Sequence, residues 1–452
     1  MTSGPASREK DRTRTLCSGR PTGQRVRLSV YDLMTGTFAT SRTFYYRQTL
    51  DADALQESLV RTLADHPLLT GRLRRDADGG LSVLCDDAGA VFRVSRSDRA
   101  MPDYGPELSA KKDLRHYLHS VNAFRVVDHD TPLLTVKVTQ MRGGGSVLGV
   151  SINHSIVDGG GFVDFLLRWS RIHRGLEPGA PAPHDRTPLE EMAAGTRAAA
   201  EDPQYTLVSG RRKFGFLWRV NAGARRVPTL TTRFSSEEVL ALRETAAAGL
   251  AGEGIEVSSG DALTAQIWRV LAALRDRPPQ STERLGLVVG LRGALKEQYP
   301  EGFWGNAVSN ITATLPTRVL REEPAERTVA AVREALNRVT PERIREESAY
   351  LEAQRRAGRV RRVLSRMSLD SFEDTVGMNN VSRLPVYQVE FGSGRPFWFE
   401  YPSIPIPWNV LVTPTPQDDY SRDVHLSLPL AAAEALRTPE WHKRLHALAP
   451  SH

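Results

Sequence analysis

A histidine and an aspartate separated by three residues stand at the start of a glycine run, Asn153-His154-Ser155-Ile156-Val157-Asp158-Gly159-Gly160-Gly161. The ordinary pKa of a histidine side chain, about 6.5, suits proton transfer near neutral pH. The aspartate can organise the turn or orient the imidazole, and the glycines let the backbone pass close to another element. Taken alone, these residues leave two readings open, a general base and a structural histidine before a turn.

The elements around this segment predict how the histidine is presented. Two β-rich runs, 133–139 and 146–153, flank the glycine-rich turn 142–145, which is a hairpin pattern. Helical periodicity follows over 162–172. The sequence therefore predicts a strand, loop and helix in which the imidazole of His154 faces a cleft.

A second segment, 382–396, contains Gly392 and Gly394 but lacks a third glycine, and Pro396 stands where a dinucleotide-binding motif would begin its helix. On its own it predicts a strand ending in a bend. The residues around Ser151 approach a nucleophile elbow, but Asn153 occupies the last glycine position. Because the histidines show no ligand spacing and no paired cysteine motif occurs, we expect no metal site.

Composition excludes several protein classes. The 452 residues carry a net charge of +7 and two cysteines, too few for a disulfide framework. A basic chain fits nucleic acid or a small molecule with several phosphates; without a nucleic-acid-binding motif, we expect no nucleic acid partner. No apolar run is long enough to span a membrane. A monomeric, cytoplasmic protein is expected.

The predicted organisation is a disordered tail over 1–24, an N-terminal domain over 25–177, a linker over 178–228 that begins with a proline-rich run, and a C-terminal domain over 229–452. Capping signals support helices that begin after Ser235 and Thr340, the latter with Pro341 as the first helical residue.

Taken together, the two segments resemble the acyl-CoA-dependent acyltransferases of the BAHD type. His154, Asp158 and Gly159 match the HxxxDG motif, and Glu390–Gly394 resembles the DFGWG motif with Glu390 for Asp and Ser393 for Trp. Other stretches resemble further motifs of the family in the same order along the chain: residues 27–46, 66–73, 133–169, 184–189, 258–269, 302–306 and 379–396.

This resemblance implies an α/β fold of two chloramphenicol-acetyltransferase-like domains, each a mixed sheet flanked by helices, with a solvent channel between them. It implies His154 as general base and Asp158 as a catalytic residue that fixes the loop. Structural roles are implied for Gly159, Gly392 and Gly394 and for an ion pair between Arg292 and Glu390.

The resemblance also implies a reaction. An acyl group would pass directly from acyl-CoA, bound as co-substrate without a prosthetic group, to a hydroxyl or amine of a small molecule. The expected acceptor is a specialised metabolite. Ser258, Ser259 and Arg383 are the expected substrate or coenzyme contacts. Two alternatives stay open: a donor on an acyl carrier protein, docked on the arginine-rich run 355–366, and a non-catalytic binding protein with this fold.

Overall fold

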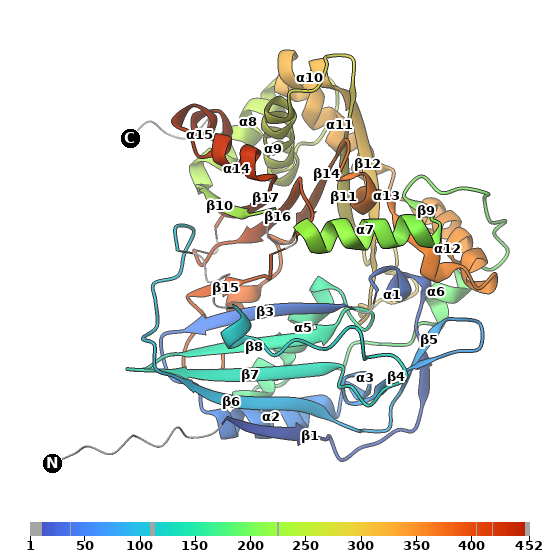
Figure 1. Ribbon diagram of the computed structural model, residues 1–452, viewed down its shortest axis with the longest axis vertical. Helices are drawn as coiled ribbons and strands as arrows, with labels where there is room; N and C mark the ends of the chain where they lie inside the picture. The colour runs from blue at the N-terminus through green and yellow to red at the C-terminus, as the bar shows by residue number, and fades with distance from the viewer. Residues whose placement is uncertain are drawn as a thin grey trace.

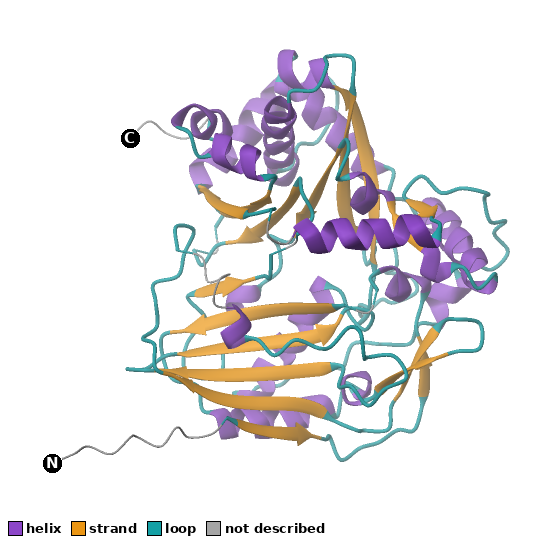
Figure 2. Ribbon diagram, viewed as in Figure 1, coloured by secondary structure: helices purple, strands orange, loops and turns teal. Residues whose placement is uncertain are grey.

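The computed structural model describes residues 11–36, 38–108, 114–223, 226–403, 405–417 and 419–447. Two mixed β-sheets of six strands organise these residues, one below the other in Figure 1, and helices cover them as Figure 2 shows. This architecture confirms the predicted fold class.

The first sheet carries the segment that ends at His154. Its strand order is β1-β6-β7-β8-β3-β15, and only the β6–β7 pair is parallel. Glycines 143, 144 and 145 adopt positive φ in the β7–β8 turn, which confirms the predicted hairpin. The strands are β1 Arg12–Leu16, β3 Ala39–Tyr46, β6 Ala90–Ser97, β7 Leu134–Met141, β8 Ser146–Asn153 and β15 Trp398–Glu400.

The second sheet has the order β10-β17-β16-β14-β11-β12, in which β14 runs parallel to both β16 and β11. Its strands are β10 Thr229–Phe234, β11 Thr282–Gly290, β12 Val308–Pro316, β14 Thr375–Asn380, β16 Asn409–Pro414 and β17 Arg422–Ser427. Short strands form two smaller sheets, β2 Arg25–Arg27, β4 Arg72–Arg75 and β5 Leu81–Leu84 in one, β9 Tyr205–Leu207 and β13 Val363–Ser365 in the other.

Helices cover the sheets because each has an apolar face. In α5 (Gly159–His173), Phe162, Leu166 and Trp169 are fully buried and pack in one core with the leucines of α2 (Ala52–Leu63). The remaining helices are α1 Val30–Met34, α3 Pro67–Thr70, α4 Leu114–Tyr117, α6 Thr187–Glu191, α7 Gly210–Gly223, α8 Ser236–Gly249, α9 Ser259–Arg275, α10 Thr317–Glu322, α11 Ala325–Asn337, α12 Pro341–Arg356, α13 Arg366–Asp370, α14 Leu430–Leu436 and α15 Pro439–Leu445.

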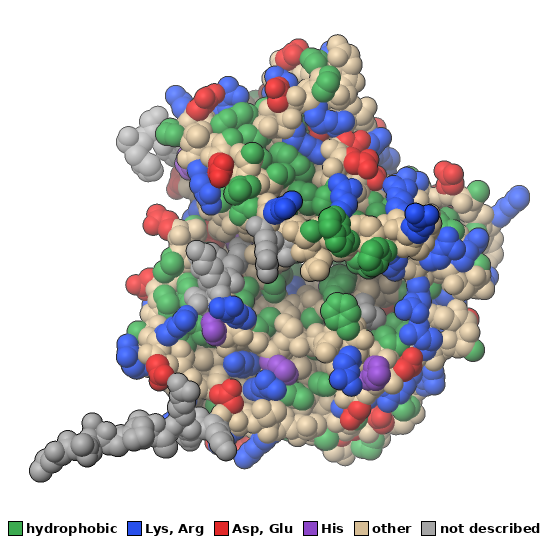
Figure 3. Space-filling view, viewed as in Figure 1, with side chains coloured by type: hydrophobic (Ala, Val, Ile, Leu, Met, Phe, Trp, Pro, Cys, Tyr) green, Lys and Arg blue, Asp and Glu red, His purple; other side chains and the backbone are tan. Residues whose placement is uncertain are grey.

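Helix α7 lies across the front of the molecule between the two large sheets (Figure 1). Its Phe214, Leu217 and Trp218 side chains are exposed, and apolar side chains gather over this helix in Figure 3. Among the described residues, no helix is both long and apolar enough to cross a membrane.

Two expectations about chain organisation need correction. The disordered tail predicted for 1–24 is wrong for Arg12–Leu16, because these residues form β1 and pair with β6; residues 1–10 lie outside the described part. The linker predicted for 178–228 contains α6, β9 and α7. Strand β15 also joins the first sheet beside β3, although its residues fall within the range predicted as the C-terminal domain.

Candidate active site

His154 is the first residue after β8, and its main chain is fixed from several directions. Its N–H donates to the carbonyl of Phe38 at 2.8 Å. Its carbonyl accepts from the Thr35 hydroxyl at 3.0 Å and from the Asn306 amide at 2.8 Å. The imidazole lies edge-on to the Phe38 ring, with 5.4 Å between centroids. The three hydrogen bonds fix the main chain of His154 where the strand ends, and Phe38 packs against its ring.

The surroundings of the imidazole favour its neutral form. Burial lowers the pKa of His154, and the positive charge of Arg42 acts in the same direction, whereas Asp158 and Asn306 oppose it. Within the described residues, Nδ1 is buried and has no hydrogen-bond partner. A neutral imidazole can accept a proton at neutral pH, which a charged one cannot.

Asp158 organises the loop and is bonded away from the ring. Its carboxylate accepts two hydrogen bonds from Arg292, at 2.8 and 3.0 Å, and others from the backbone N–H groups of Gly161 and Ala307. The Gly161 bond makes Asp158 the N-cap of α5. With four donors on a buried carboxylate, Asp158 fixes the start of α5 against the 302–307 segment.

The expected pair between Arg292 and Glu390 is wrong. Arg292 bonds Asp158, and the Glu390 carboxylate instead lies 3.3 Å from Arg174 at the end of α5. The physical reason is burial: Asp158 is almost fully buried and needs a bidentate cation, whereas Glu390 and Arg174 are both partly exposed to water.

The glycines of the second motif serve a bend. Gly392 and Gly394 have φ of +79° and +96°, the left-handed region that favours glycine. Ser393 between them has a buried hydroxyl for which the described residues offer no hydrogen-bond partner. Gly159 belongs to the first motif, and a Cβ on it would lie 3.3 Å from Nη2 of Arg42.

A buried polar network supports the histidine loop and was missed by the sequence reasoning. Asp32, in α1, accepts from Arg186 at 3.2 Å and from the backbone and side chain of Asn306 at 3.1 and 2.8 Å. Arg186 also donates to the carbonyls of Ile156 and Trp304. The available signal was that Arg186 and Asn306 lie in stretches, 184–189 and 302–306, already matched to family motifs.

The three expected substrate contacts line one cavity of about 440 Å³. Ser258 caps α9 by accepting from Asp261 N–H, and its hydroxyl also accepts from Arg333 at 3.1 Å. Ser259 and Arg383 line the same cavity, as do the cationic side chains of Arg333 and Arg422. The structure thus brings together the residues predicted to contact the coenzyme and adds two arginines.

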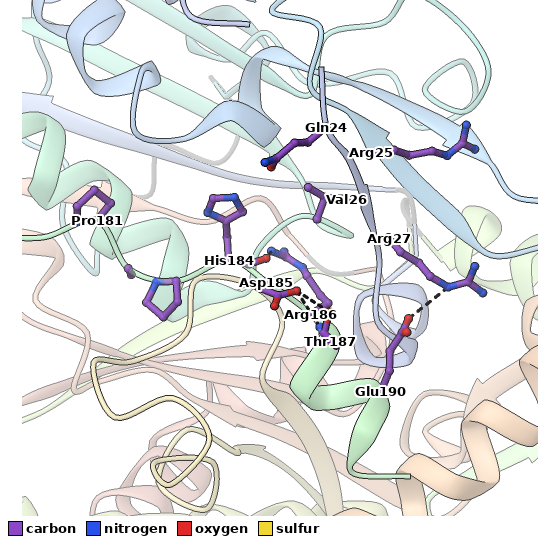
Figure 4. Close-up of a pocket in the computed structure, with 12 residues that line it drawn as sticks. Gln24, Arg25, Val26, Arg27, Pro181, His184, Asp185, Arg186, Thr187 and Glu190 are labelled. Carbon is purple, nitrogen blue, oxygen red and sulfur yellow. Dashed lines mark hydrogen bonds and ion pairs between the residues drawn. The ribbon is translucent and has the colours of Figure 1, made fainter. Parts of the chain in front are cut away.

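A second cavity, of about 670 Å³, lies between 24–27 and 181–190. Figure 4 shows Arg27 bonded to Glu190 at its edge, with Asp185 and Thr187 joined nearby. None of the predicted site residues lines this cavity. Throughout the described ranges, no cluster of three or more His, Cys, Asp and Glu side chains could hold a metal ion.

Known proteins are similar to this chain over most of its length. A family model described as "Transferase family" matches residues 10–440. The shikimate O-hydroxycinnamoyltransferase of Nicotiana tabacum is 25% identical over 417 residues, 90% of this chain and 92% of that protein.

Two solved structures have the same fold. Vinorine synthase aligns over 98% of this chain and 99% of its own with a TM-score of 0.67 and 17% identity. TRI101 of F. sporotrichioides, complexed with coenzyme A and T-2, aligns over 93% of this chain and 98% of its own with a TM-score of 0.71 and 15% identity.

Proposed function

The chain belongs to the Transferase family, the BAHD acyltransferases, and we propose that it moves an acyl group from an acyl-CoA thioester to a hydroxyl or amine of a small molecule, with His154 as general base. The observation that carries this proposal is the imidazole that follows β8, whose main chain is fixed by hydrogen bonds and whose pKa is lowered by burial of the ring nitrogen. Acyl-CoA is the donor by analogy with the relative that is complexed with coenzyme A.

The proposed reaction is direct. The neutral imidazole of His154 takes the proton of the acceptor as its oxygen or nitrogen attacks the thioester carbonyl carbon. The tetrahedral intermediate then expels the coenzyme thiolate, which receives the proton from the imidazolium. Holding both substrates at one ring removes the entropic cost of a second encounter.

The cavity lined by Ser258, Ser259 and Arg383 is the proposed coenzyme site. Arg422 on its wall adds positive charge, which suits a coenzyme with several phosphates, whereas Arg333 there pairs with Asp261. The N-terminus of α9 opens on the same cavity, and backbone N–H groups there attract anions.

The test is acceptor-dependent release of free thiol from short acyl-CoA esters and from hydroxycinnamoyl-CoA, with a panel of alcohols and amines. We expect His154→Ala to lose about 10²- to 10⁴-fold in kcat, the usual contribution of a general base, and to stay folded. His129→Ala is the matched control, because His129 is exposed.

Undiminished turnover in His154→Ala would refute the general base. Turnover only with acyl groups on a carrier protein would replace the donor, and acceptor binding without any thiol release would favour a binding protein.

A further inference from the structure

Arg42, in the middle of β3, is a buried cation that has no carboxylate partner among the residues that the structure describes. Its side chain is 2% exposed. The guanidinium stacks 4.0 Å from the ring of Phe162 and 4.5 Å from that of Tyr401. Nη1 donates to the Thr40 hydroxyl at 3.1 Å, and Nε is buried with no hydrogen-bond partner among the described residues.

The other buried arginines of the described ranges each have a carboxylate partner. Arg186 pairs with Asp32, Arg72 with Asp130, and Arg355 with Glu352. Burying a charge is costly unless an opposite charge and hydrogen bonds compensate it. Stacking on two rings recovers part of this cost, but the orphaned Nε shows that the guanidinium is not fully satisfied by the protein.

A second unsatisfied donor belongs to the same cluster. The Tyr401 hydroxyl is buried and has no hydrogen-bond partner in the described part of the chain. Tyr401 follows β15 directly, and β15 pairs with β3 so that Glu400 faces Thr43. The next residue along β15 therefore lies beside Arg42, as the ring contact confirms. The Nε–H of Arg42 and the hydroxyl of Tyr401, two stacked side chains, are therefore both donors without an acceptor among the described residues.

The cluster adjoins the histidine loop. Nη2 of Arg42 lies 3.3 Å from the position of a Cβ on Gly159, the residue after Asp158. Strand β3 pairs along its length with β8, which ends at Asn153, one residue before His154. The positive charge of Arg42 is close enough to His154 to favour a lower pKa of the imidazole.

From this geometry we infer that Arg42 and Tyr401 form a subsite for a carboxylate carried by one of the two substrates, at the end of the acyl chain or on the acceptor. The inference rests on the proposed function and specifies its substrate class. A carboxylate can accept from the guanidinium and the phenol at once, and charge-assisted bonds of this kind are among the strongest available to a protein.

The experiment compares matched substrates that differ only in charge. One arm measures kcat/KM for succinyl-CoA against butyryl-CoA, and the other measures hydroxy and amino acids against their primary amides. In one arm, we expect the wild type to prefer the acid by about 10- to 100-fold, the range of a charge-assisted bond. Binding of succinyl-CoA and butyryl-CoA by calorimetry gives a readout that is independent of turnover.

The variant Arg42→Gln is expected to lose this preference, and Arg42→Lys to recover part of it. The readout is the ratio of kcat/KM for the acid to kcat/KM for its uncharged partner within each variant, because Arg42 also affects the pKa of His154 and its loss changes both rates. Arg47→Gln is the matched control: Arg47 stacks on Phe397 at 3.8 Å but has a carboxylate partner in Asp103. Thermal unfolding identifies any variant that does not fold, and Arg42→Lys then decides the question.

The outcomes separate the two proposals. Robust thiol release with equal kcat/KM for acid and uncharged partner in both arms overturns the carboxylate subsite and leaves the acyltransferase intact. An undiminished preference for the acid in Arg42→Gln also overturns it, as does an undiminished preference in Arg42→Lys when Arg42→Gln does not fold. Absence of thiol release from every donor overturns the proposed function, while calorimetry still reports whether Arg42 distinguishes succinyl-CoA from butyryl-CoA.

Discussion

At the scale of single residues, the environment of His154 predicts the pH dependence of the enzyme. Burial and Arg42 lower the pKa of His154, so its folded value lies below the ordinary value of about 6.5. A general base works only when unprotonated, and activity is therefore lost as the pH falls through that lowered value. We expect kcat/KM to be flat near neutrality and to fall only on the acid side of pH 6.5. Initial rates across the pH range check this, and an acid limb centred above pH 7 would contradict it.

Asp158 and Glu390 predict a contrast between two ion pairs. The Asp158 side chain is 2% exposed and accepts four hydrogen bonds, two of them from Arg292. Because Asn carries no charge, Asp158→Asn leaves Arg292 without its partner in the ion pair. We expect a loss of about 3 kcal/mol in the free energy of unfolding, with lower kcat because the histidine loop shifts. Glu390→Gln is the control, since its partly exposed pair with Arg174 should cost at most about 1 kcal/mol. Denaturant unfolding measures both, and equal losses would refute the assigned roles.

The sequence was informative about residues where the signal is local. His154, Asp158 and Gly159 occupy one short motif. Ser258 indicates the start of α9 because it forms a capping box with Asp261. The predicted pairing of Arg292 with Glu390 is wrong because a second carboxylate, that of Asp158, was also available far away in the sequence. Which of them meets the guanidinium depends on the depth at which the folded chain buries each.

At the scale of elements, strongly patterned segments were predictable and weakly patterned ones were not. The leucines of α2 recur every four residues, and the β7–β8 turn has three glycines with positive φ. Strand β1 has no such pattern: four of its five residues are exposed, and arginine alternates with threonine. It forms a strand because it pairs with β6, which is far away in the sequence and which no local pattern identifies as its partner.

Strand β15 shows the same limit across a greater distance. It has only three residues, yet it completes the first sheet beside β3, more than 350 positions earlier in the chain. All three residues are buried, so the strand adds apolar area to a core built mainly from residues before 170. A prediction that divides the chain into two domains at one linker therefore assigns β15 to the wrong sheet.

At the scale of the whole molecule, Arg186 joins parts that the chain keeps far apart. Its guanidinium bonds Asp32 of α1, the Ile156 carbonyl in the histidine loop and the Trp304 carbonyl. Asp32 in turn holds Asn306, whose amide supports the His154 carbonyl. The network therefore links overall stability to the position of the base.

Replacing Arg186 with methionine tests this link. The substitution keeps much of the apolar stem but leaves the Asp32 carboxylate, fully buried, without a cation. We expect a loss of about 3–5 kcal/mol in the free energy of unfolding and a fall in kcat at temperatures where the protein is still folded, because Ile156 and Asn306 lose their common anchor. Arg211→Met is the control, since Arg211 is exposed on α7. A variant that loses stability while its kcat stays at the wild-type value would mean that the network holds the fold together without positioning His154.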